Sequence, residues 1–249
     1  MEKLKPTSWD EHRELVIPGN YDMTVSFCVE HFIFLAKQAI EKYGNFFVAL
    51  SGGSTPHAIF ERLSISSQNA LDWSKVYLFW SDERSVPPTD KSSNYLMAME
   101  SGLKKLSIPK ENIHRMVAEE NIEENAKNYE NIIKATLKDR AFDLVMLGLG
   151  EDGHTASLFP NTEGLQVKDR LVIANFVPQQ NTWRMSLTFT CINNASHIVF
   201  YVLGAGKKNI LAEVLKKEPA IYPAQRVGTK DKKALFIADE ASAALITRP

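Results

Sequence analysis

A carboxylate and an imidazole stand two positions apart in the middle of the chain. Asp152 and His154 belong to the stretch Gly148-Leu-Gly-Glu-Asp-Gly-His154, which follows an apolar run. An imidazole beside a carboxylate is a common arrangement for a general base that works near neutral pH. A structural histidine is the alternative, but glycines on one side and small residues on the other favour an exposed loop. We therefore predict that His154, next to Asp152, is a catalytic base.

The same stretch matches the pattern GxGxxG, yet its surroundings disfavour a dinucleotide. Glu151 and Asp152 would place negative charge where a pyrophosphate would sit, and Pro160 prevents a long crossover helix. The chain has no GK[ST] of a P-loop, no HExxH or Cys/His cluster for zinc, and no GxSxG elbow. A water molecule activated by His154 remains as the nucleophile, and we expect no cofactor and no metal.

A second turn, Ser51-Gly-Gly-Ser-Thr-Pro56, lies between an expected strand and an expected helix. Gly52 and Gly53 let the backbone approach a ligand, Ser54 or Thr55 can cap the helix, and Pro56 suits its first position. Free N–H groups at a helix N-terminus bind anions, most naturally a phosphate. A well-capped turn without a ligand is the alternative interpretation.

Basic side chains follow further strands. Arg184 begins one expected strand, and Lys207-Lys208 follows Leu203-Gly-Ala-Gly at a strand-to-helix turn, where a lysine can donate to a phosphate. We expect Lys208 to be the solvated one of the two. Ser81-Asp-Glu-Arg84 puts three charges at a strand end, which suits either ligand contact or ion pairs. His57, next to the glycine turn, is a further candidate for substrate contact.

Composition excludes several classes of partner. The 249 residues hold 29 Lys and Arg against 30 Asp and Glu, a net charge of −1, so bulk charge favours neither nucleic acid nor an anionic membrane. The apolar runs are far shorter than a membrane span, and the N-terminus lacks the apolar region of a secretory signal. Cys28 and Cys191 lie in apolar stretches and are interpreted as packing residues. We expect a soluble cytoplasmic protein.

Short apolar runs alternate with amphipathic stretches along the whole chain. This alternation predicts an α/β fold: a Rossmann-like, mostly parallel sheet sandwiched by helices, with a few antiparallel strands in the C-terminal half. With no repeat and no linker, residues 1–249 are expected to form a single domain. In such a sheet the functional residues lie in loops at the carboxyl ends of the strands, so we expect them in the loops 51–56, 81–94, 148–160 and 204–208. Expected strands cover 46–50, 76–80, 142–147, 170–174, 184–189, 197–203 and 234–237; expected helices cover 22–43, 94–103, 119–137 (exposed), 207–217, one opening at Pro56 and a final short one.

Five motifs in order carry a resemblance to a known family. They are Leu50-Ser-Gly-Gly-Ser-Thr-Pro56, Trp80-Ser-Asp-Glu-Arg-Ser-Val-Pro87 with Ser93-Asn94, Gly148 to Pro160, Arg184-Met-Ser-Leu-Thr188, and Gly204-Ala-Gly-Lys207. From about residue 20 to 240 the chain resembles the 6-phosphogluconolactonase branch of the glucosamine/galactosamine-6-phosphate isomerase superfamily. Asp90 departs from the pattern, since many relatives carry a histidine near it, and this leaves the role of the 85–92 loop open.

The resemblance implies hydrolysis of 6-phospho-D-glucono-1,5-lactone to 6-phosphogluconate in the oxidative pentose phosphate pathway. It implies His154 as the base, Asp152 as its orienting carboxylate, and substrate or phosphate contacts from a larger set: Gly52, Gly53, Ser54, Thr55, Arg84, Arg184 and Lys207. Arg84 and a backbone N–H of the 148–154 loop are both candidates for stabilising the oxyanion. The partner would be a small-molecule substrate, with the chain a monomer or weak homo-oligomer.

Two alternatives belong to other classes. A glucosamine-6-phosphate deaminase or isomerase would need a glutamate where this chain has Phe159. A non-catalytic sugar-phosphate sensor would keep the glycine turn but would need neither Asp152 nor His154.

Overall fold

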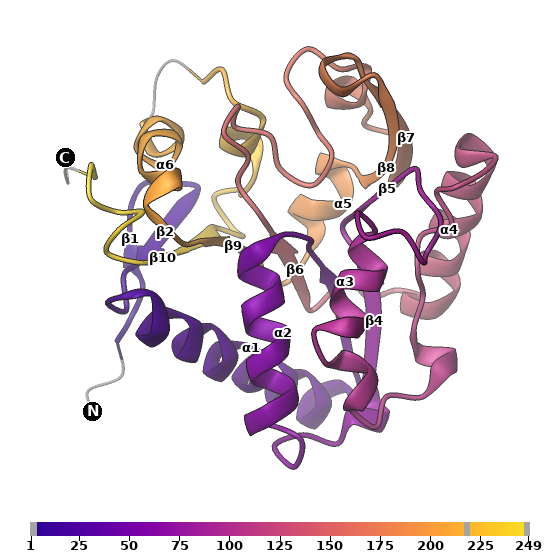
Figure 1. Cartoon of the computed structure of the whole chain (residues 1–249), viewed down its shortest axis with the longest axis horizontal. Helices are drawn as coiled ribbons and strands as arrows, with labels where there is room; N and C mark the ends of the chain where they lie inside the picture. Colours follow the sequence, from indigo (N-terminus) through magenta and orange to yellow (C-terminus); the bar gives the residue numbers. More distant parts are fainter. Residues whose placement is uncertain (1–3, 217–219, 247–249) are drawn as a thin grey trace.

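The computed structural model describes residues 4–216 and 220–246 around a seven-stranded sheet (Figure 1). Its strand order is β1-β2-β10-β9-β6-β3-β4, and every neighbouring pair except β1–β2 is parallel. Every residue of β3, β6, β9 and β10 is buried, which explains their continuous apolar sequences. The strands are β1 (Thr7–Ser8), β2 (Arg13–Val16), β3 (Phe46–Leu50), β4 (Val76–Trp80), β6 (Leu144–Leu147), β9 (Ile198–Val202) and β10 (Ala234–Ala238). The expected mostly parallel α/β sheet is confirmed.

Helices flank this sheet. The longest, α1, begins after Asn20, whose side chain accepts the Met23 N–H at 3.1 Å. It ends at Gly44, which adopts a left-handed conformation (φ 82°) and donates to the Ile40 carbonyl. This stop was predicted. The helices are α1 (Tyr21–Tyr43), α2 (Ser54–Ser66), α3 (Asn94–Glu100), α4 (Ile122–Leu137), α5 (Phe189–Asn194) and α6 (Lys208–Leu215). The 3-10 turns are η1 (Trp73–Lys75), η2 (Leu103–Lys105), η3 (Lys110–Asn112), η4 (Glu163–Gln166), η5 (Pro178–Gln180), η6 (Ala205–Lys207) and η7 (Pro223–Arg226).

By length and composition alone, α1 could cross a membrane. Its apolar residues have another explanation, because Cys28, Phe32 and Ala36 are buried in the hydrophobic core. The helix packs against β3, β10 and α2. We therefore interpret α1 as a core helix.

A second, three-stranded antiparallel sheet has the order β5-β8-β7. Its strands are β5 (Asp82–Arg84), β7 (Val172–Val177) and β8 (Thr182–Leu187). In Figure 1 it lies beside α4. The antiparallel pairing of β7 and β8 was expected, whereas β5 was expected to be loop. Because side chains alternate along a strand, Asp82 and Arg84 share one face of this sheet and Glu83 takes the other.

The charged helix α4 is not simply exposed. Its buried positions include Tyr129, Ile133 and Leu137, and the helix packs on β7 and β8. The Glu130 carboxylate is buried as well and accepts hydrogen bonds from Arg170 Nε at 2.8 Å and Lys134 Nζ at 2.5 Å. The sequence showed the amphipathic pattern but not the surface that the apolar face would cover.

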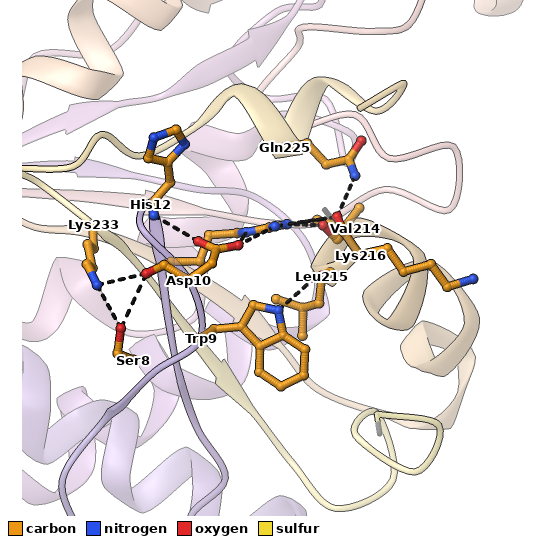
Figure 2. Close-up of polar contacts among 10 residues, drawn as sticks. Ser8, Trp9, Asp10, His12, Val214, Leu215, Lys216, Gln225 and Lys233 are labelled. Atoms are coloured by element: carbon orange, nitrogen blue, oxygen red, sulfur yellow. Dashed lines mark hydrogen bonds and ion pairs between the residues drawn. The ribbon is translucent and has the colours of Figure 1, made fainter. Parts of the chain in front are cut away.

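The N-terminal segment, for which we expected no strand, completes one end of the sheet. β2 pairs in parallel with β10. Figure 2 shows the Trp9 indole N–H donating to the Leu215 carbonyl, at 2.7 Å, and Lys233 Nζ donating to Ser8 and Asp10. These bonds fasten residues 8–10 to the end of α6 and the start of β10.

Several expected boundaries are wrong. β7 and β8 are shifted toward their connecting turn relative to the expected 170–174 and 184–189. The shift follows from Thr188, whose hydroxyl accepts the Cys191 N–H at 3.2 Å, so that Phe189 begins α5 instead of ending a strand. Helix α2 begins at Ser54 instead of Pro56.

The expected final short helix is also wrong. Residues 240–245 form turns, in which the Asp239 carboxylate accepts the Ser242 N–H at 2.8 Å and the Gly204 N–H at 3.1 Å. That local bonding competes with helix formation. The expected helix 207–217 is η6 followed by α6, and Lys217 lies outside the described residues.

Candidate active site

Loops at the carboxyl ends of β3, β6 and β9 meet the small sheet around a cavity of about 300 Å³. Eight of the predicted site residues line it: Gly52, Gly53, Ser54, Thr55, Arg84, His154, Arg184 and Lys207. Asp152 is not part of the lining and contacts His154 instead. Five chain segments far apart in the sequence therefore bring their predicted residues to one place.

The glycine turn presents open backbone donors to this cavity. Gly53 is the residue before the first turn of α2, with φ 103°, a conformation that side chains rarely tolerate. The first hydrogen bond of the helix runs from His57 N–H to the Gly53 carbonyl, at 3.1 Å. The N–H groups of Ser54 and Thr55 therefore have no acceptor inside the helix. The expected cap from Ser54 or Thr55 is wrong, because no side chain caps α2.

His154 is held by a tight turn. Its Nδ1 lies 2.5 Å from Asp152 Oδ1, and its backbone N–H donates to the same oxygen at 3.1 Å. Gly150 N–H donates to the His154 carbonyl at 2.9 Å, and Gly153 N–H donates to the Gly150 carbonyl at 3.0 Å. A Cβ atom on Gly150 would lie 2.1 Å from His154 Nδ1. The glycine is therefore required for the imidazole to occupy this position.

Phe159 packs against the other side of the imidazole. The two ring centroids lie 3.8 Å apart with the planes at 20°. Since Nδ1 is engaged by Asp152, Nε2 is the ring nitrogen that no described residue contacts by a hydrogen bond. A buried phenylalanine at position 159 also places no carboxyl group beside His154.

Two arginines face each other across the small sheet. In the antiparallel pairing of β5 and β8, Arg84 is the direct partner of Arg184. Burial lowers the pKa of Arg184, and the positive charge of Arg84 lowers it further. Neither guanidinium makes an ion pair with a carboxylate within residues 4–216 and 220–246. The negative charges of Asp82 and Glu83 act the other way and raise the pKa of Arg184. They offset part of the positive charge, and an anion in direct contact with the two guanidinium groups would stabilise the pair further.

Lys207 adds a third cation to the cavity. Its Nζ donates to the Leu149 carbonyl at 2.8 Å, so the lysine is anchored to the loop that carries His154. Lys208 is exposed and does not line the cavity, as expected. His57, the further candidate for substrate contact, lies in a separate groove between α1 and α2 and does not line this cavity.

Unpartnered polar atoms gather at this cavity. Of the buried side-chain atoms without a hydrogen-bond partner in the described chain, four belong to lining residues: Arg84 Nε, Asn94 Oδ1, Arg184 Nε and Tyr201 Oη. Buried polar groups are usually paired, so their concentration here indicates a polar ligand.

Comparison with known proteins agrees with this chemistry. The model of the family described as glucosamine-6-phosphate isomerases/6-phosphogluconolactonase matches residues 20–236. The chain belongs to this family. A 6-phosphogluconolactonase of Chlamydia pneumoniae is 42% identical over 92% of this chain and 88% of its own length.

Solved structures support the same family. A 6-phosphogluconolactonase of Thermotoga maritima is 32% identical, with a TM-score of 0.78 over 90% of this chain and 99% of its own. One from Trypanosoma cruzi is 25% identical, with a TM-score of 0.85 over 97% of this chain and 99% of its own.

Sequence reasoning missed lining residues that this family member places beside the arginines. Asp82 is buried in the lining; its Oδ2 accepts from Ser157 Oγ at 2.7 Å and its Oδ1 from Asn94 Nδ2 at 3.2 Å. Glu83 points the other way, and its carboxylate accepts the N–H groups of Asn94 and Tyr95 at 2.7 and 2.9 Å. The alternation of an Asp-Glu-Arg run in a strand could have shown that Asp82 and Arg84 share a face.

No group of three or more His, Cys, Asp or Glu side chains suited to a metal ion occurs in residues 4–216 and 220–246. The expectation that no metal or cofactor is needed stays a prediction.

Proposed function

We propose that this protein hydrolyses 6-phospho-D-glucono-1,5-lactone to 6-phosphogluconate. The observation that carries the proposal is that His154, held by Asp152, lines the same cavity of about 300 Å³ as Arg84, Arg184, Lys207 and the open N-terminus of α2. None of these three cations forms an ion pair in the part of the chain that the structure describes. Such a cavity suits a small, phosphorylated substrate with an electrophilic centre. The relatives named above are 6-phosphogluconolactonases, which supports the same substrate.

In this mechanism His154 is the general base. Its Nε2 takes a proton from a water molecule as the water attacks C1 of the lactone. The Asp152 carboxylate accepts a hydrogen bond from Nδ1–H, fixes the ring orientation and stabilises the imidazolium that forms. As the tetrahedral intermediate collapses, the bond between C1 and the ring oxygen breaks, and the ring oxygen takes the proton from His154 Nε2 to become a hydroxyl. The imidazole is then neutral again, and the carboxylic acid formed at C1 ionises and releases a proton to solvent.

The phosphate would bind to the amides of residues 52–55, to Arg184 and to Lys207. In this arrangement these groups bind the phosphate and not the reacting C1, so their binding energy serves to orient the lactone carbonyl. Since Lys207 is also bonded to the Leu149 carbonyl, phosphate binding and the position of the catalytic loop are linked.

Arg84 is our candidate for stabilising the oxyanion. The backbone N–H groups of Gly150, Gly153 and His154 already donate within their own turn, so they are not open donors. Arg84 lines the cavity and has a buried Nε without a partner. A fixed cation at the developing negative charge lowers the barrier because it needs no reorganisation.

We expect the enzyme to work in the cytoplasm without a protein partner, as a monomer or weak homo-oligomer. Cys28 and Cys191 are buried free thiols, which suits a reducing compartment. Burial raises the pKa of Cys191 to about 12, so this thiol is unreactive at neutral pH.

Two assays run side by side test the proposal. Proton release from freshly prepared 6-phosphogluconolactone should far exceed the spontaneous rate, and ammonia release from glucosamine 6-phosphate should stay at background. Ammonia release alone would replace the proposal with a deaminase, which the Phe159–His154 stack disfavours. Binding of 6-phosphogluconate without turnover in either assay would indicate a sensor.

A further inference from the structure

The guanidinium group of Arg184 has one hydrogen-bond partner in the part of the chain that the structure describes. That partner is the side-chain amide oxygen of Gln180, which accepts from an Nη2 hydrogen of Arg184. Both residues line the cavity. No feature of the motifs assigned a role to Gln180, and it is the only lining residue from the turn between β7 and β8 in that described part.

The turn that carries Gln180 is well defined. Val177, the last residue of β7, pairs with Thr182, the first residue of β8, and η5 spans Pro178–Gln180 between them. Asn181 closes the turn in a left-handed conformation, with φ 47°. The two glutamines of the turn point to different partners, since Gln179 Nε2 donates to the Pro160 carbonyl at 2.8 Å.

The chemical nature of this partner matters. An amide oxygen accepts one guanidinium hydrogen but carries no net charge, so it orients Arg184 without neutralising it. A carboxylate at the same position would form an ion pair with Arg184 and compete with an incoming phosphate. Arg84, directly opposite, keeps the local charge positive.

We propose that Gln180 is a positioning residue for substrate binding, which directs the Arg184 guanidinium into the cavity while leaving its charge available to the phosphate. This inference rests on the proposed function, because it assumes that Arg184 contacts the phosphate. It assigns part of the substrate affinity to the β7–β8 turn, a segment outside all five motifs.

Variants of the turn that add a charge or shorten a side chain test the proposal. They are made in the full-length protein and assayed with 6-phosphogluconolactone as substrate. Gln180→Ala should raise KM by about three- to tenfold, the value of one lost hydrogen bond, with kcat within about twofold. Gln180→Glu should raise KM further, because it neutralises Arg184. Gln179→Glu, with the same charge one residue away and outside the cavity lining, should raise KM less than Gln180→Glu. Gln179→Ala measures separately the loss of the bond to the Pro160 carbonyl. A wild-type KM for Gln180→Ala, or an equal rise for Gln179→Glu, would overturn the proposal.

A double variant shows whether Gln180 acts through Arg184. Once Arg184 is replaced by Ala, adding Gln180→Ala should leave kcat/KM unchanged. A further drop in the double variant would contradict a positioning role. If Arg184→Ala alone keeps the wild-type KM, the phosphate assignment in the proposed function has failed. If Arg184→Ala raises KM while Gln180→Ala does not, only the inference about Gln180 has failed.

Discussion

Arg84 and Arg184 lie directly opposite each other in the antiparallel pair of β5 and β8. Like charges at such positions destabilise a sheet. The positive charge of Arg84 lowers the pKa of Arg184, and a bound anion would relieve this repulsion.

Replacing Arg184 by Met should raise KM by at least about tenfold, because a charge-assisted contact to phosphate is lost. The free energy of unfolding of the ligand-free protein should stay the same or rise, since a like-charge contact is removed. Urea unfolding and initial-rate kinetics measure the two effects. A clear loss of stability would contradict the view that the pair is unfavourable without ligand.

Arg140 provides the matched control. Its Nη2 donates to both carboxylate oxygens of buried Asp143 at 2.8 Å, far from the cavity lining. Arg140→Met should lower the free energy of unfolding by about 1–3 kcal/mol, since it leaves a buried carboxylate without its cation. KM should not change.

Two adjacent lysines allow a similarly close comparison. Lys207→Ala should raise KM about tenfold, because Lys207 lines the cavity. Lys208→Ala removes the same charge from an exposed position outside the cavity and should leave KM unchanged. Equal effects from both variants would show that only the general field of the helix terminus matters.

Gly150→Ala should reduce kcat on the order of 10²-fold. The added Cβ would lie 2.1 Å from His154 Nδ1, so the imidazole must leave its place beside Asp152. Gly206→Ala is the control, because a Cβ at Gly206 meets no atom within 4 Å and the residue needs no positive φ. Circular dichroism should show both variants folded. Full activity of Gly150→Ala would mean that the observed imidazole position is not the catalytic one.

Glu130 predicts a pH dependence of stability. Burial by itself raises the pKa of its carboxyl group, but hydrogen bonds from Lys134, Arg170 and the backbone at Leu171 outweigh burial and bring the pKa to about 2. A pKa lowered by folding stabilises the native state above the unfolded value near 4.5, here by roughly 3 kcal/mol. That contribution is lost as pH falls from about 4.5 to about 2.

The variant Glu130→Gln isolates this contribution. It should be less stable than wild type by a few kcal/mol at pH 7, and the difference should shrink steadily below pH 4.5. Urea unfolding of both proteins at several pH values measures it. A difference that does not change with pH would mean that Glu130 stabilises by packing and not by its charge.

Much of the fold and of the site could be predicted from sequence because, in a parallel α/β sheet, one pattern indicates both. Continuous apolar runs indicate the buried strands, and the functional residues lie in the loops that follow these strands. Continuous apolar runs such as 46–50 and 198–203 identified buried parallel strands, and the loops after them contained the cavity residues. Where polar side chains compete locally for the backbone, prediction failed. Thr188 and Asp239 redirect the chain through hydrogen bonds that apolar periodicity does not show.

The part of the site that could not be predicted from the sequence depends on pairing between strands that are distant in the chain. Nothing near Arg84 in the sequence indicates that Arg184 will lie opposite it, or that Gln180 will accept a hydrogen bond from Arg184. The roles of the predicted site residues, and the single-domain expectation for residues 1–249, stay predictions. The mutations above test the site roles directly.

The most direct test of the account is the rate of proton release when the protein meets fresh 6-phosphogluconolactone, measured for wild type and for His154→Ala. We predict fast acid production by wild type and a loss of about 10²- to 10⁴-fold in kcat for the variant, with little change in KM. A His154→Ala enzyme with wild-type kcat would remove the imidazole from the mechanism and contradict the central claim.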